Sequence, residues 1–184
     1  MIQIEDEIIR VDVVGSNTVQ NLLTYSERLD EWFSFFSAKV IPNAIDAPDG
    51  TRTADKLNLS AGSSAQVVRS FVGSPNTTYT VSFYGRSVTG TEVITLYRNP
   101  SNGGSNTFTL TTEWKRFTNT YTTNASSPYY NVLFLHNGTA GNTDEYYIWG
   151  VQVEESSTAS RYIQSVESFV SRASTATRII SSSI

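Results

Sequence analysis

Residues 147–163 read YIWGVQVEESSTASRYI, a dense aromatic and β-branched run followed by a polar connector and a second hydrophobic pair. Side chains along 146–153 alternate with the period-two pattern of a β-strand. The alternation predicts one face with Tyr147, Trp149, Val151 and Val153, and a second face with Ile148, Gly150 and Gln152. We therefore expect the last core strand here, with Trp149 filling the interior of a sandwich.

The residues after this strand are expected to close the fold. Gly150 has no side chain, so a neighbouring ring or backbone can approach the strand there. Glu154, Glu155 and the serines carry the chain outward, and Tyr162 with Ile163 hooks it back. The stretch therefore predicts a closing seam more than a binding site.

Short strands fill the rest of the chain from residue 21. Segments rich in β-branched and aromatic residues recur between clusters of Gly, Pro, Asn and Ser. We expect strands at residues 54–60, 66–72, 78–86, 92–98, 105–110, 115–122, 129–136 and 146–153. Such a series predicts an all-β fold, an antiparallel β-sandwich or jelly roll. YSERLDEWFSFF, at 25–36, is either one short helix or a loop wrapped around Trp32.

The sequence divides into three expected parts. In residues 1–20, Ile9, Val11 and Val13 alternate with polar residues, which predicts either a first strand of the sheet or an arm for assembly with a partner chain. Residues 21–165 form the jelly-roll domain. Residues 166–184 form a serine-rich C-terminal extension whose spaced apolar residues pack on the domain or dock on a neighbour.

Composition excludes several classes of function. The chain has 184 residues, a net charge of −4 and only 16% charged residues, so nucleic acid is not an expected partner. No cysteine is present, which excludes disulfides and thiolate metal sites. We find no signal peptide and no apolar run of the ~18 residues that a membrane span needs, so we expect a soluble protein without a membrane partner.

The motifs of catalysis are missing. The sequence has no G-x-S-x-G elbow, no P-loop and no dinucleotide fingerprint. Its one histidine, His136, is interpreted as a hydrogen-bonded structural residue. The adjacent acids Asp144 with Glu145 and Glu154 with Glu155 are interpreted as solvated turn charges, not as the carboxylate pair of a glycosidase. We expect no catalytic residue, metal site or cofactor.

Binding is better supported than catalysis. Amphipathic rings with a polar tip suit sugar recognition, and sheets can present them on a flat face. The candidate glycan-binding residues, expected on solvent-facing strand surfaces, are Tyr84, Arg86, Tyr97, Arg98, Tyr129 and Tyr130. The alternative for each tyrosine is a place at the edge of the core or in a contact between subunits.

Five segments resemble, in order, a domain that is widespread in tailed-bacteriophage virion and tail-associated proteins. They are NLLTYSERLDEW at 21–32, APDGTRTADKL at 47–57, YTVSFYGR at 79–86, WKRFTNTYT at 114–122 and YIWGVQVEESSTASRYIQS at 147–165. That domain is similar to jelly rolls of the carbohydrate-binding-module type. Similar jelly rolls often carry a structural calcium near the last strand. This chain has Trp149 and Gly150 in that region, so we expect no calcium.

The resemblance implies a non-enzymatic virion accessory protein. It would decorate and cement the capsid or form a short fibre, as a homo-oligomer, with a trimer favoured, exposed on the particle beside other virion proteins. Its jelly roll would adhere to host-surface glycans. The alternatives are a tail-associated adhesin that recognises host polysaccharide and an accessory module of a polysaccharide hydrolase.

Overall fold

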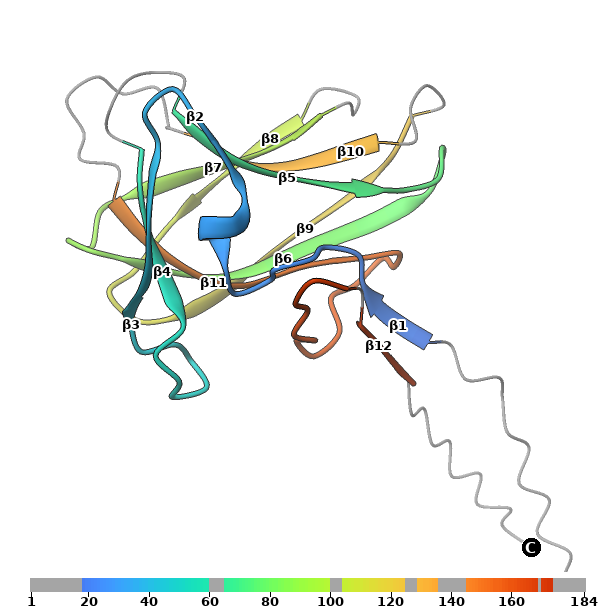
Figure 1. Ribbon diagram of the computed structural model, residues 1–184. Helices are drawn as coiled ribbons and strands as arrows, with labels where there is room; N and C mark the ends of the chain where they lie inside the picture. Colours follow the sequence, from blue (N-terminus) through green and yellow to red (C-terminus); the bar gives the residue numbers. More distant parts are fainter. Residues whose placement is uncertain are drawn as a thin grey trace, which may run out of the picture.

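The computed structural model describes residues 18–59, 65–99, 104–124, 129–135, 145–168 and 170–173. These residues form two five-stranded antiparallel sheets, packed face to face, and a separate two-stranded ribbon (Figure 1). The predicted antiparallel β-sandwich is confirmed. No helix among the described residues is long and apolar enough to cross a bilayer.

We call the two layers sheet 1 and sheet 2. Sheet 1 has the order β2 (Phe33–Phe35), β5 (Gln66–Val72), β10 (Tyr129–Leu135), β7 (Val93–Asn99) and β8 (Gly104–Thr109). Sheet 2 has the order β3 (Lys39–Ile45), β4 (Ala54–Asn58), β11 (Glu145–Glu154), β6 (Thr78–Ser87) and β9 (Lys115–Thr122). Strands adjacent in a sheet are mostly distant in sequence, so the register between them joins remote residues.

Aromatic rings fill the space between the sheets. Phe83 of β6 lies at the centre, with its ring centroid 5.2 Å from that of Phe134 and 5.5 Å from those of Phe108 and Phe117. Tyr79, Val81 and Phe83, at alternate positions of β6, are all buried in this core. Edge-to-face and offset rings of this kind stabilise a core beyond the area that they bury.

The predicted alternation of β11 is wrong beyond residue 149. Pairing with β6 shifts register between Trp149 and Gln152, where Gly150 adopts a φ of +63°. A β-bulge inserts one extra residue and reverses which side chains face inward. Val151 therefore points into the core, whereas Trp149 lies on the outer face of sheet 2 and does not fill the sandwich.

The bulge confirms the expected role of Gly150. A Cβ atom built on this residue would lie 3.3 Å from the ring of Tyr162, so a neighbouring ring does approach the strand here. The hook is confirmed as well. The Tyr162 hydroxyl lies 2.6 Å from Ser26 Oγ, and the backbone N–H of Ile163 donates to Gln152 Oε1 at 2.7 Å.

The two ends of the described chain pair with each other. Strand β1 (Thr18–Asn21) runs antiparallel to β12 (Val170–Ala173), with Thr18 opposite Ala173 and Asn21 opposite Val170. The residues of the predicted N-terminal strand, 9–13, lie outside the described residues. Within the described part, the two predicted terminal parts therefore meet in one ribbon beside sheet 2.

The segment 25–36 adopts the loop alternative. It contains a 3-10 turn, Leu29–Glu31, and its residues 33–35 form β2. Trp32 is buried, and its indole N–H donates to the carbonyl oxygen of Tyr25 at 3.0 Å. The loop therefore anchors one edge of sheet 1 through a single tryptophan.

Candidate functional site

The predicted binding residues are divided between the two sheets and do not form one site. Tyr84 and Arg86 belong to β6 on sheet 2. Tyr97 belongs to β7 on sheet 1, and the backbones of Arg98 and Tyr129 lie in the same sheet. The side chains of Arg98 and Tyr129 are outside the described part of the structure.

The placement of Tyr130 on a solvent-facing surface is wrong. Its ring is only 1% exposed and packs between the sheets, with its centroid 5.7 Å from that of Phe71. Successive residues of a strand face opposite sides, so Tyr129 and Tyr130 could not both face solvent. The inward alternation of β10 through Tyr130, Val132 and Phe134 settles which one is buried.

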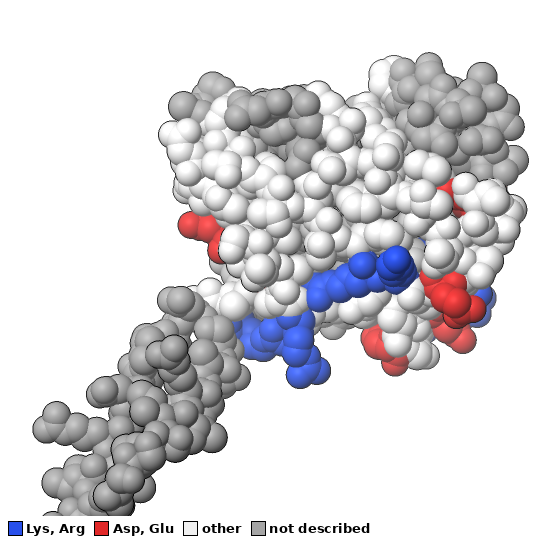
Figure 2. Space-filling model, turned by 180° about the vertical axis from the view of Figure 1, so that it is seen from behind, with Lys and Arg blue, Asp and Glu red and all other residues white. Residues whose placement is uncertain are grey.

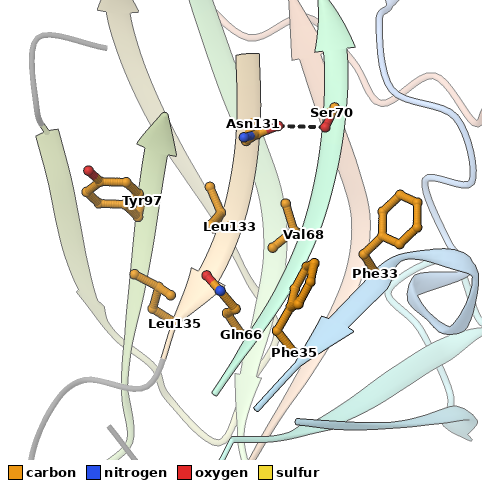
Figure 3. A pocket seen from close by; sticks show the side chains of 9 residues that line it. All are labelled: Phe33, Phe35, Gln66, Val68, Ser70, Tyr97, Asn131, Leu133 and Leu135. Atoms are coloured by element: carbon orange, nitrogen blue, oxygen red, sulfur yellow. Dashed lines mark hydrogen bonds between the residues drawn. The ribbon is translucent and has the colours of Figure 1, made fainter. Parts of the chain in front are cut away.

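A hollow of about 450 Å³ lies on the outer face of sheet 1. Four neighbouring strands, β2, β5, β10 and β7, supply its lining (Figure 3). We call this hollow the groove and define it by Phe33, Phe35, Gln66, Val68, Ser70, Tyr97, Asn131, Leu133 and Leu135. The groove therefore crosses four adjacent strands of sheet 1.

One row of in-register residues makes the floor and both walls. Val68 is the Cα partner of Phe33 on one side and of Leu133 on the other, and Leu133 is in turn the partner of Tyr97. Val68 and Leu133, each 8% exposed, form the floor, and the Phe33 ring is 65% exposed. Three strand spacings of ~4.8 Å separate the β2 and β7 backbones by roughly 14 Å. An extended ligand can therefore lie along the strands between two aromatic walls.

Polar groups surround this apolar floor. Ser70 Oγ donates to Asn131 Oδ1 at 2.6 Å, which fixes the orientation of the Asn131 carboxamide. Among the described residues, nothing accepts a hydrogen bond from the Asn131 amide nitrogen, and the Gln66 carboxamide and the Tyr97 hydroxyl have no hydrogen-bond partner. A floor of apolar side chains with a few oriented donors and acceptors is the usual composition of a small-molecule or saccharide site.

Phe33 and Phe35, which form one aromatic wall, were not predicted to be binding residues from the sequence. Their segment was interpreted as a helix or a loop around Trp32, so no strand face was assigned to it. The signal was the alternation in FSF, where Phe33 and Phe35 flank Ser34 as they would in a strand. Phe33 and Phe35 also remain 65% and 45% exposed, unusually high values for large apolar rings.

Two of the acidic residues named in the sequence make contacts within the fold. Glu154, expected to be a solvated turn charge, is instead 1% exposed, and its carboxylate accepts the Ser160 N–H at 3.0 Å. Glu145 forms an ion pair with Lys56, 2.6 Å between Oε2 and Nζ. His136 and Asp144 lie outside the described residues. No group of three or more His, Cys, Asp or Glu side chains within the described ranges is arranged to hold a metal ion.

Comparison of the sequence finds no related protein, but comparison of the fold finds similar solved structures. No model of a protein family matches the sequence, and no curated protein matches it significantly. A domain of tailspike protein 4 from bacteriophage CBA120 has a TM-score of 0.53 at 12% identity, over 72% of this chain and 21% of that chain.

Carbohydrate-binding modules share the same sandwich. The tandem CBM22 domain of Xyn10C from Paenibacillus barcinonensis has a TM-score of 0.53 at 17% identity, over 77% of this chain and 46% of that chain. A CBM61 module in complex with β-1,4-galactotriose has a TM-score of 0.51 at 16% identity, over 74% of this chain and 99% of that one. The chain therefore has the fold of carbohydrate-binding-module jelly rolls.

Proposed function

We propose that this chain is a non-catalytic glycan-binding module and that the groove on sheet 1 is its binding site. The observation that carries the proposal is the in-register row Phe33–Val68–Leu133–Tyr97, which sets two aromatic walls beside an apolar floor. Sugar rings present apolar C–H faces and polar edges. Such rings suit the Phe33 and Tyr97 walls, while their hydroxyls suit the carboxamides of Gln66 and Asn131.

The double variant F33A/F35A is expected to lower glycan affinity at least tenfold, a loss of about 1.4 kcal/mol, because it removes one aromatic wall of the groove. Isothermal titration with the best glycan from an array measures this change. Phe36→Ala is the matched control, since Phe36 is also 65% exposed but does not line the groove. Equal affinity in F33A/F35A and the wild type, or no array binding by the folded protein, would refute the proposal.

We propose a tailed-bacteriophage particle as the setting of this module, either as a capsid-decorating or short-fibre subunit or as a tail adhesin. The tailspike likeness at 12% identity and the ordered sequence segments support this setting. A homotrimer bound to other virion proteins is the expected assembly.

Deleting residues 1–17 and 174–184 is expected to abolish incorporation into particles, while β1 and β12 remain intact and the sandwich stays folded. Mass spectrometry of purified particles measures incorporation, and light scattering measures the oligomeric state. Undiminished incorporation of the doubly truncated chain would exclude the terminal segments as the attachment device.

A further inference from the structure

A second hollow, of about 300 Å³, lies on the outer face of sheet 2, on the opposite side of the sandwich from the groove. Its walls combine three aromatic rings, Tyr84, Trp149 and Tyr162, with three arginines, Arg116, Arg161 and Arg172. We call it the arginine pocket. In Figure 2 the Lys and Arg side chains gather in a band low on the body, whereas Asp and Glu side chains lie towards the right and left edges.

The floor of the arginine pocket is built on three adjacent strands of sheet 2. Tyr84 is the Cα partner of Trp149 on β11 and of Arg116 on β9, so the three side chains stand in one row. The Trp149 indole N–H donates to Thr53 Oγ1 at 2.9 Å, and its ring centroid lies 4.6 Å from that of Tyr162. Burial and the nearby Glu27 carboxylate raise the pKa of Tyr162, so this ring stays neutral in the physiological range.

Arg116 is a fixed positive charge in this row. Its Nη1 donates to the carbonyl oxygen of Ser160 at 2.6 Å and its Nη2 to Ser82 Oγ at 2.8 Å. Its guanidinium carbon also lies 5.5 Å from the centroid of the Tyr84 ring. Neither hydrogen-bond partner is charged, so the positive charge of Arg116 is not neutralised by these contacts.

The other two arginines are exposed at the rim. Arg161 comes from the hook after β11, and Arg172 comes from β12, where its Nη2 donates to the Arg161 carbonyl oxygen at 3.3 Å. Within the described ranges, none of the three pocket arginines forms an ion pair with a carboxylate. By contrast, Arg28, Arg52 and Lys56 all do. An excess of positive charge is therefore concentrated here in a chain whose net charge is −4.

Asp49 is the one acidic residue of the pocket wall. Its Oδ1 already accepts the Thr51 backbone N–H at 2.9 Å and the Thr51 hydroxyl at 2.7 Å. Its second oxygen has no partner among the described residues and can accept a hydrogen bond from a hydroxyl group. The guanidinium groups of the pocket can bind an anionic group of a ligand. The Asp49 carboxylate disfavours a second negative charge on that ligand.

We propose that the arginine pocket is a second binding site, specific for an acidic sugar with a single carboxylate, such as a hexuronic acid unit. The carboxylate binds to Arg161 and Arg172, a hydroxyl donates to Asp49, and the Tyr84 ring contacts the sugar face. The choice of an anion rests on the arginines alone. The choice of a sugar rests on the proposed glycan-binding function.

Titration with D-glucuronic acid tests the proposal, with D-glucose and inorganic sulfate as comparison ligands. Calorimetry at low ionic strength should detect millimolar binding of glucuronate and none of glucose in this pocket, with affinity falling as salt is added. The variant R161Q/R172Q is expected to weaken glucuronate binding at least tenfold. The variant R28Q/K39Q removes the same charge outside the pocket and is expected to leave binding unchanged.

Three results would overturn the proposal. The first is glucuronate binding that is equal in R161Q/R172Q and the wild type. The other two are glucose or sulfate binding that is as tight as glucuronate binding and is lost in R161Q/R172Q. The groove is tested separately, because F33A/F35A should leave glucuronate binding intact. If the array shows no glycan binding at the groove while glucuronate binding still depends on the arginines, the proposal for the groove fails and the proposal for the arginine pocket stands.

Discussion

Asn21→Ala is expected to lower the free energy of unfolding by about 4 kcal/mol, one of the largest effects of any single substitution in this chain. Asn21 is fully buried. Its Nδ2 donates to the carbonyl oxygens of Val151 at 3.2 Å and Ile163 at 3.0 Å, and its Oδ1 accepts the N–H groups of Leu23 and Val153, each at 3.1 Å. Alanine would leave two buried donors and two buried acceptors without partners.

Urea unfolding followed by tryptophan fluorescence measures the change. Asn21→Asp is the informative companion, because it keeps the two accepted bonds, loses both donated ones and adds a buried charge. It is expected to be at least as destabilising as the alanine variant at neutral pH. A change below about 1 kcal/mol in Asn21→Ala would contradict the role of this side chain as the tie between β1, the β11 bulge and the hook.

Gly150→Val is expected to lower the free energy of unfolding by about 4 kcal/mol, the sum of backbone strain and crowding. The φ of +63° lies in the left-handed region, which a β-branched residue strongly disfavours. The new side chain would also meet the Tyr162 ring, since even a Cβ atom lies 3.3 Å from it. The bulge and the hook would have to move together.

Gly50→Val is the matched control. Gly50 has a φ of +86°, but a Cβ atom built there has nothing within 4 Å. Its substitution carries the backbone strain without the crowding, so a loss of about 2 kcal/mol is expected in the same urea experiment. Equal losses at the two glycines would mean that contact with Tyr162 contributes nothing to the effect.

Period-two alternation predicted the regular strands well. The predicted ranges 66–72 and 115–122 coincide with β5 and β9. The pattern failed where one residue breaks the period. The bulge at Gly150 places Trp149 on the outer face and Val151 in the core. A glycine inside a strand often marks a bulge, but it does not by itself show which side chains face inward before and after it.

Short edge strands were harder to predict. Strand β2 has only three residues, and β3 contains Pro42, which the sheet tolerates because β3 lies at its edge. In the groove, Tyr97 was a predicted binding residue and does contribute to the lining. Phe33 and Phe35 also line the groove but were not predicted. The groove depends on register among four strands far apart in sequence, and a single sequence does not encode that register in any local pattern.

The ribbon of β1 and β12 determines how the domain responds to force applied through its ends. Thr18 and Ala173 are Cα partners at the outer end of the ribbon, and both chain ends leave from that point. Antiparallel hydrogen bonds lie perpendicular to the strands, so tension on the ends loads them one after another, as in unzipping, and not all at once in shear. As β1 separates from β12, the break in pairing reaches Asn21. Its four buried hydrogen bonds must then break before the sandwich opens. Under load, we expect the ribbon to separate first, at low force, and the hydrogen bonds of Asn21 to set the force at which the domain itself unfolds.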